Sequence, residues 1–136
     1  MNERFAAVAL YAGLNAILLV ALAINAGARR GAQKAFEPGA GGDASLSRAI
    51  RAHGNFAENA PLLLLVLAAL ALMNTAALPL HVLGATFTLG RIAHAFGMMQ
   101  AKHPNALRFI GNVSTWLALL GGGLLCLLRF AETMQA

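Results

Sequence analysis

Residues 46–73 read LSRAIRAHGNFAENAPLLLLVLAALALM, and this stretch decides the fold class. Its uninterrupted apolar part, 61–73, is shorter than the roughly 20 residues that a helix needs to cross a bilayer. The residues before it must therefore enter the membrane as well, although they include Arg48, Arg51 and Glu58. The stretch predicts one membrane helix whose first half carries charged side chains.

The remainder of the chain is equally apolar. Hydrophobic residues make up 59% of the 136 positions and charged residues only 11%, against about 25% charged residues in soluble domains. So short a chain cannot hide several nearly uncharged runs in a water-soluble core. We therefore predict an all-α membrane protein, a single domain over residues 1–136 that forms a bundle of four transmembrane helices, with spans at 5–26, 46–73, 78–99 and 107–130.

The first span is predicted to stay in the membrane. Its apolar run is too long for the core of a cleaved secretion signal, and it leads directly into Arg29 and Arg30. A cleaved signal peptide is the weaker alternative. The single cysteine, Cys126, lies in another apolar run and excludes an internal disulfide, so we expect it to be a packing residue.

The connections between the spans predict the topology. Residues 29–42 combine charges with glycines and read as a surface loop, after which Asp43 or Ser45 offers a helix N-cap. The second connection, at Asn74 and Thr75, is short and uncharged. Loops one and three hold the positive charges, so the positive-inside rule predicts that they face the cytoplasm and that both termini lie outside. These charges are Arg29, Arg30, Lys34 and Lys102.

The polar part of the second span forms a narrow stripe. At 100° per residue its four strongly polar side chains fall at roughly 0°, 300°, 340° and 280°. Ionisable groups at membrane depth face a bundle interior or a wet cavity and pair with one another, so we expect Arg51 to pair with Glu58. Snorkelling of Arg48 to the surface is an open alternative. Pro61 is expected to kink the helix beside the stripe. The stripe consists of Arg48, Arg51, Asn55 and Glu58.

The third span repeats this pattern on a smaller scale. Its residues Phe87, Arg91, His94 and Met98 lie three or four positions apart and share one helix face. We interpret Arg91 and His94 as site residues, because this membrane histidine accompanies an arginine. The fourth span begins with Arg108. Its further polar residues are typical of ordinary hydrogen bonding between helices. They are Asn112, Ser114 and Thr115.

These groups all fall in the cytoplasmic halves of their spans and together predict a cationic pocket. Four arginines against the single Glu58 favour an anionic ligand with carboxylates, which guanidinium groups bind in two-point fashion, while Glu58 receives an ammonium group. No metal is expected, because His53 and His94 lack the carboxylate or cysteine partners of a metal site. Nucleic acid is not expected either, because the basic residues are dispersed.

At these residues the sequence resembles a known family. The motif RAIRAHGNFAENAPLLLL at 48–65 resembles the signature of the MAPEG family, membrane-associated proteins in eicosanoid and glutathione metabolism. The segment GRIAHAFGM at 90–98 matches that family's second characteristic segment, and the likeness extends through Arg108 and VSTW at 113–116. The resemblance covers most of the chain and is closest to small bacterial inner-membrane members.

The resemblance implies a homotrimer with glutathione bound as co-substrate at each subunit interface, in a cavity open to the cytoplasm. It implies that Arg51, Asn55 and Glu58 hold the glutathione peptide and that Arg91 and His94 complete the pocket. Arg108 would stabilise the glutathione thiolate and is the expected catalytic residue. To this set the cationic pocket described above adds Arg48 as a binding residue.

On this basis we expect a membrane-bound, glutathione-dependent transferase or peroxidase acting on lipophilic electrophiles. Many eukaryotic members have a tyrosine where Met98 stands, some have a polar or basic residue at Gly54, and prostaglandin synthases have a serine in place of Phe109. A non-catalytic glutathione- or lipid-binding membrane protein is therefore the alternative. A small proton-coupled exporter using Glu58 as the proton carrier ranks last, because the first span contains no acidic residue.

Overall fold

The fold is known from a computed structural model, which describes residues 2–35, 42–101 and 104–135. Within these ranges the chain forms four α-helices and no β-strand, which confirms the predicted all-α architecture. Each helix contains almost all of its predicted span and most extend beyond it. The helices are α1 (Glu3–Ala32), α2 (Ala44–Leu72), α3 (Ala77–Met99) and α4 (Ala106–Met134).

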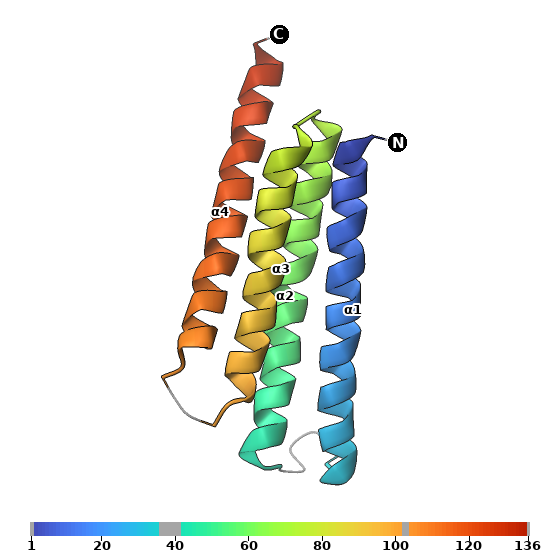
Figure 1. The fold of residues 1–136 in the computed structure, drawn as a ribbon, viewed down its shortest axis with the longest axis vertical. Helices are drawn as coiled ribbons and strands as arrows, with labels where there is room; N and C mark the ends of the chain where they lie inside the picture. Colours follow the sequence, from blue (N-terminus) through green and yellow to red (C-terminus); the bar gives the residue numbers. More distant parts are fainter. Residues whose placement is uncertain (1, 36–41, 102–103, 136) are drawn as a thin grey trace.

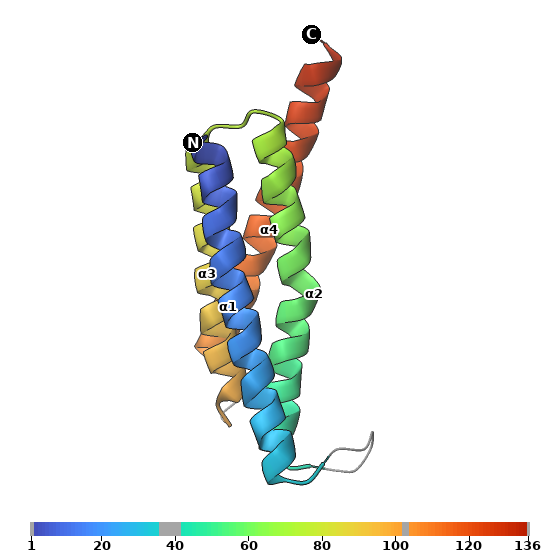
Figure 2. The same ribbon diagram turned by 90° about the vertical axis from the view of Figure 1, so that its right-hand side faces the viewer.

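Consecutive helices are antiparallel and form an up-and-down bundle. α1 and α4 each pack against both α2 and α3, whereas the described residues show no packing between α1 and α4 themselves. Figures 1 and 2 show α1 and α4 on opposite flanks of the central pair, with both chain termini and the α2–α3 turn at one end of the bundle. The C-terminal ends of α1 and α3 and the first turns of α2 and α4 lie at the opposite end.

The outer surface of the bundle is suited to lipid. Of the described helices, α1, α2 and α4 are each long and apolar enough to cross a membrane. α3 has 23 residues, roughly 35 Å of helix, and carries its strongly polar side chains inside the bundle. Large apolar side chains on all four helices face outward, as a membrane protein requires. Examples are Ile17, Leu65, Leu89 and Leu127. The chain is an integral membrane protein.

The first predicted loop begins later than expected. Arg29 and Arg30 belong to the last turn of α1, where positive side chains interact favourably with the partial negative charge of a helix C-terminus. The helix ends at Ala32, and Lys34, just beyond the C-cap residue Gln33, has a positive φ of 52°. The glycines of this loop at positions 39 and 41, and the loop-three charge Lys102, lie outside the described residues.

The start of α2 is held by Asp43, one of the two predicted N-cap residues. Its carboxylate accepts hydrogen bonds from the backbone nitrogens of Ser45 and Leu46 at 2.8 and 2.9 Å. The side chain of Gln33, at the end of α1, donates a further bond of 2.7 Å. Hydrogen bonds to its carboxylate hold the pKa of Asp43 well below its usual range, and the bond from the Ser45 hydroxyl has the largest effect.

The α2–α3 turn follows the prediction. α2 ends at Leu72, and Asn74 adopts a left-handed conformation with φ 60°, which asparagine tolerates better than most residues. The amide of Thr75 then donates to the carbonyl of Leu70 over 3.0 Å. Upstream, Pro61 lies within α2, and the helix continues through it as one element.

The glycines of α4 differ in their packing. A Cβ atom at Gly122 would lie 2.6 Å from Cγ1 of Val66 on α2, so the predicted close packing is confirmed there. A Cβ at Gly123 would meet open space. Close contact between helices is therefore a property of one glycine of this run and not of all three.

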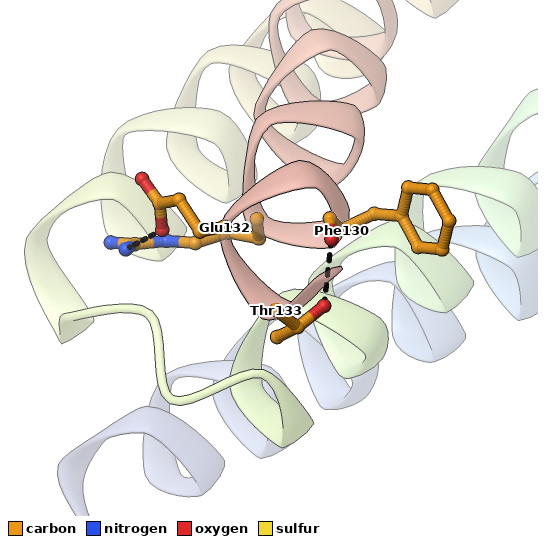
Figure 3. A network of polar contacts seen from close by, with 4 residues as sticks. Phe130, Glu132 and Thr133 are labelled. Atoms are coloured by element: carbon orange, nitrogen blue, oxygen red, sulfur yellow. Dashed lines mark hydrogen bonds and ion pairs between the residues drawn. The ribbon is translucent and has the colours of Figure 1, made fainter. Parts of the chain in front are cut away.

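The C-terminal turns of α4 contain contacts between residues close together in sequence. A guanidinium nitrogen of Arg129 lies 2.7 Å from the Glu132 carboxylate, and the Thr133 hydroxyl donates to the carbonyl of Phe130 over 2.7 Å. Figure 3 shows both contacts on the last turns of the helix. This ion pair lies at the end of the bundle that holds the termini, away from the predicted site.

Candidate ligand-binding site

A cavity of about 170 Å³ lies at the end of the bundle opposite the chain termini. Three arginines line it: Arg48 and Arg51 from the first turns of α2, and Arg108 from the first turn of α4. Met98, near the end of α3, contributes an apolar wall. Three arginines around so small a space favour an anion, because a shared negative charge offsets the mutual repulsion of the three positive side chains.

Arg108 reaches this cavity because α3 and α4 approach closely at their adjoining ends. A Cβ atom at Gly97 would lie 2.9 Å from the Cα of Arg108, closer than real Cβ atoms come. Only glycine therefore lets the start of α4 lie directly on α3. Asn105 caps α4, and its side-chain oxygen accepts from the backbone nitrogen of Leu107 at 2.9 Å. The cap and the glycine together fix the position of Arg108.

We expect Asn105→Ala to lower the free energy of unfolding by about 1 kcal/mol, because the first turn of α4 loses its side-chain cap. Thermal unfolding of the purified protein in detergent measures the change. Asn105→Asp is the matched control, since a carboxylate caps a helix as well as an amide does. Equal losses in both variants would show that the cap is not the cause.

A second polar cluster lies buried beside the cavity residues. Arg91 is only 1% exposed, and its guanidinium donates to Oδ1 of Asn55 at 2.6 Å and to Oγ1 of Thr115 at 3.2 Å. Thr115 in turn donates to the carbonyl of Gly111 over 2.8 Å. The cluster therefore joins α2, α3 and α4 through one buried cation.

His94 completes this cluster. Its Nδ1 lies 3.0 Å from Nη2 of Arg91. A guanidinium only donates hydrogen bonds, so Nδ1 must be the acceptor and the ring carries its proton on Nε2. The predicted shared face of α3 is confirmed, because Phe87, Arg91, His94 and Met98 are all buried.

The polar stripe on α2 is divided by the fold. Arg48 and Asn55 are half-buried, whereas Arg51 and Glu58 are exposed in the single chain, although Arg51 also borders the cavity. The expected pairing of Arg51 with Glu58 is wrong for the single chain, because the described residues contain one ion pair, Arg129–Glu132. Their separation of seven residues places Arg51 and Glu58 about 10 Å apart along the helix axis.

The sequence is similar to one known family along most of its length. The model of the MAPEG family matches residues 8–128. The chain belongs to the MAPEG family. The inner membrane protein YecN of Escherichia coli strain K12 is 32% identical over 114 residues, which cover 82% of this chain and 83% of YecN. YecN of Escherichia coli O6:H1 matches with the same identity and coverage. No solved structure was found to match the chain.

In this MAPEG chain the fold brings the sequence-predicted site residues into two neighbouring groups and leaves one apart. Arg48, Arg51 and Arg108 share the cavity. Asn55, Arg91 and His94 share the buried cluster. Glu58 faces outward, two turns along α2 from Arg51.

Two further contributors to this MAPEG site were not predicted. Thr115 was interpreted as an ordinary interhelical contact, although it lies two turns after Arg108 on the same side of α4 and bonds to Arg91. Its heptad spacing from Arg108 was the available signal. Ser47, which lines the cavity, precedes the polar stripe and gave no signal of its own.

Proposed function

We propose that this MAPEG protein is a membrane-bound, glutathione-dependent transferase or peroxidase that acts on lipophilic electrophiles. The observation that carries the proposal is the convergence of Arg48, Arg51 and Arg108 on one cavity at one end of a membrane bundle. Glutathione fits this charge pattern because it has two carboxylates and one ammonium group. The guanidinium groups would bind carboxylates, and Glu58 would receive the ammonium.

Arg108 is the proposed catalytic residue. A thiol with a pKa near about 8.5 is mostly protonated at neutral pH, so a guanidinium beside the sulfur would raise the fraction of nucleophilic thiolate. In a transferase step the thiol loses its proton and the sulfur bonds to the electrophilic carbon, from which the leaving group departs. The apolar outer surface would admit a lipophilic substrate from the bilayer.

We further propose that the site is completed by a second copy of the chain, in a homotrimer. A cavity of about 170 Å³ is smaller than the roughly 300–1,000 Å³ of typical ligand pockets. Glu58 is exposed near the middle of α2, and an ionised carboxylate facing lipid at that depth is costly. A neighbouring copy on this face of α2 would cover Glu58 and enlarge the cavity.

The proposed orientation places the cavity toward the cytoplasm of a bacterial inner membrane. Arg29, Arg30, Arg48, Arg51 and Arg108 gather at the cavity end of the bundle. The positive-inside rule then puts loops one and three in the cytoplasm and both termini outside. The relative YecN is named as an inner membrane protein.

A second candidate function is a non-catalytic glutathione- or lipid-binding protein. The observation in its favour is the apolar wall that Met98 gives the cavity, at the position where many eukaryotic members have tyrosine. Binding of glutathione without turnover of chlorodinitrobenzene, a general electrophile, would favour this second function over the first.

Isothermal titration of the detergent-solubilised protein with glutathione tests the proposal. We expect Arg51→Ala and Glu58→Ala each to weaken binding about 10- to 100-fold, because each removes a charge-assisted hydrogen bond worth about 1.5–3 kcal/mol. Arg129→Ala and Glu132→Ala are matched controls that remove the same charges at the far end of the bundle. A wild-type protein that binds no glutathione would overturn the proposed function.

A further inference from the structure

We propose that Arg91 is a positioning residue that turns the Asn55 amide so that its NH₂ group, and not its carbonyl, faces the ligand. Thr115 anchors Arg91 in this role. The inference rests on the proposed function, because it assigns a specificity to the same glutathione site. Arg91 was expected to complete the ligand pocket, but in this role it acts through Asn55 and does not touch the ligand.

The orientation of Asn55 follows from donor and acceptor chemistry. Nη2 of Arg91 lies 2.6 Å from the Asn55 side chain, and a guanidinium nitrogen can only donate. The atom facing Arg91 must therefore be the amide oxygen. The amide nitrogen then points away from the buried cluster, and among the described residues it makes no hydrogen bond of its own. Asn55 is half-buried and lies one turn along α2 from Arg51, a lining residue of the cavity.

Arg91 is too deeply buried to serve as a ligand contact itself. It is 1% exposed, and two of its guanidinium nitrogens are bonded to the side chains of Asn55, Thr115 and His94. The hydroxyl proton of Thr115 is used by the carbonyl of Gly111, which leaves an oxygen lone pair for Nη1 of Arg91. Thr115 and Gly111 thus fix the guanidinium, and the guanidinium fixes the amide.

The orientation of the Asn55 amide decides which chemical group of the ligand can bind beside it. Asn55 offers two N–H donors, so the group bound there is an acceptor, a carboxylate or a carbonyl oxygen. An ammonium group is excluded at this position, because it only donates. The ammonium of the ligand must therefore lie further along α2, on the side of Glu58. Asn55 thereby sets the direction in which a peptide such as glutathione lies along the helix.

The substitution Asn55→Asp distinguishes the role of the amide oxygen, which faces Arg91, from that of the NH₂ group, which faces the ligand. The aspartate retains an oxygen acceptor for Arg91 and gives a charge partner to a cation that has no acidic partner among the described residues. We expect the melting temperature to stay the same or rise. The ligand-facing NH₂ becomes a carboxylate oxygen, so glutathione affinity measured by titration should fall at least about 10-fold.

Thr115 tests the anchoring step. We expect Thr115→Val, which keeps the shape but removes the hydroxyl, to weaken glutathione binding about 3- to 10-fold, and Thr115→Ser to restore it, because Thr115 acts on the ligand only indirectly, through Arg91 and Asn55. Thr88→Val is the matched control. Thr88 is another buried threonine, whose hydroxyl accepts from Asn15 on the α1 side of the bundle over 2.9 Å, so its loss should leave affinity unchanged.

Each outcome bears on the inference. Wild-type binding that Asn55→Asp does not weaken overturns it while leaving the proposed function intact. A lower melting temperature for Asn55→Asp also overturns it, because the inward atom would then not be an oxygen bonded to Arg91. Equal loss of affinity in Thr88→Val and Thr115→Val would reduce Thr115 to a general packing role. Failure of the wild type to bind glutathione would instead overturn the proposed function and this inference together.

Discussion

Gly111→Leu is expected to prevent stable packing of α4 on α3. A Cβ atom at position 111 would lie 2.5 Å from the carbonyl oxygen of Gly90 and 2.7 Å from the backbone nitrogen of His94. Both contacts are to backbone, which cannot rotate aside as a side chain would. The two helices would have to separate, and the whole side chain of leucine would follow the Cβ into the gap.

The expected cost of this substitution exceeds that of ordinary overpacking. Extra methylene groups in a packed core cost about 1–3 kcal/mol, and here the backbone itself must move, so we expect more than about 3 kcal/mol. That is a large part of a total stability of about 5–15 kcal/mol. The separation would also pull Thr115 away from Arg91, which disrupts the buried cluster.

Gly123→Ala is the matched control on the same helix. A Cβ there meets nothing within 4 Å, and alanine favours a helix by up to about 1 kcal/mol over glycine. Thermal unfolding and size-exclusion chromatography in detergent should show an aggregated or strongly destabilised Gly111→Leu and an unchanged or slightly stabilised Gly123→Ala. A Gly111→Leu protein that melts like the wild type would contradict the close approach of α3 and α4.

Arg108→Ala is expected to reduce turnover of a general electrophile by about 100-fold or more, the size of effect seen when one donor to a developing anion is removed. The reason is the proposed thiolate: without the guanidinium, the bound sulfur would keep its proton at neutral pH. The loss should fall mainly on kcat, while Arg51→Ala should act mainly on KM. Ultraviolet absorbance of bound thiolate gives a readout independent of the second substrate.

Arg108→Lys and Arg129→Ala complete this experiment. Lysine keeps a positive charge at the start of α4 and should retain part of the turnover, although it lacks the planar fork of arginine. Arg129 belongs to the same helix but pairs with Glu132 at its other end, so its removal should leave kcat unchanged. Equal kcat values for wild type and Arg108→Ala would assign thiolate stabilisation to another group.

The sequence predicted the helices well because length and apolarity decide them locally. Four long apolar runs predicted four helices, and the structure adds mainly a few residues at their ends. The first loop was placed too early because Arg29 and Arg30 resemble loop residues, although charges of this sign also stabilise the last turn of a helix. At Asp43 and Asn74 the local chemistry was sufficient, since a cap and a left-handed turn depend on adjacent residues.

The candidate site was predicted only in part, because helical periodicity places residues on a face without saying what that face meets. The stripe on α2 is real as a periodic pattern, yet the fold turns Asn55 toward Arg91 and leaves Glu58 outside. The pairing of Arg51 with Glu58 failed for the same reason. Thr115 looked like an ordinary polar residue until the approach of α4 to α3 brought it to Arg91.

The sequence by itself determined the membrane environment, the four helices and the cationic character of one end, because burial of apolar surface and placement of charge depend on residues close together in the chain. Only the tertiary structure decided which polar groups meet. The meeting of Arg48, Arg51 and Arg108 around a cavity, and of Arg91 with Asn55 and Thr115, depends on helices that touch far apart in sequence. The contacts that α4 contributes through Arg108 and Thr115 are possible because Gly97 and Gly111 let the backbones of α3 and α4 approach more closely than a larger side chain would allow.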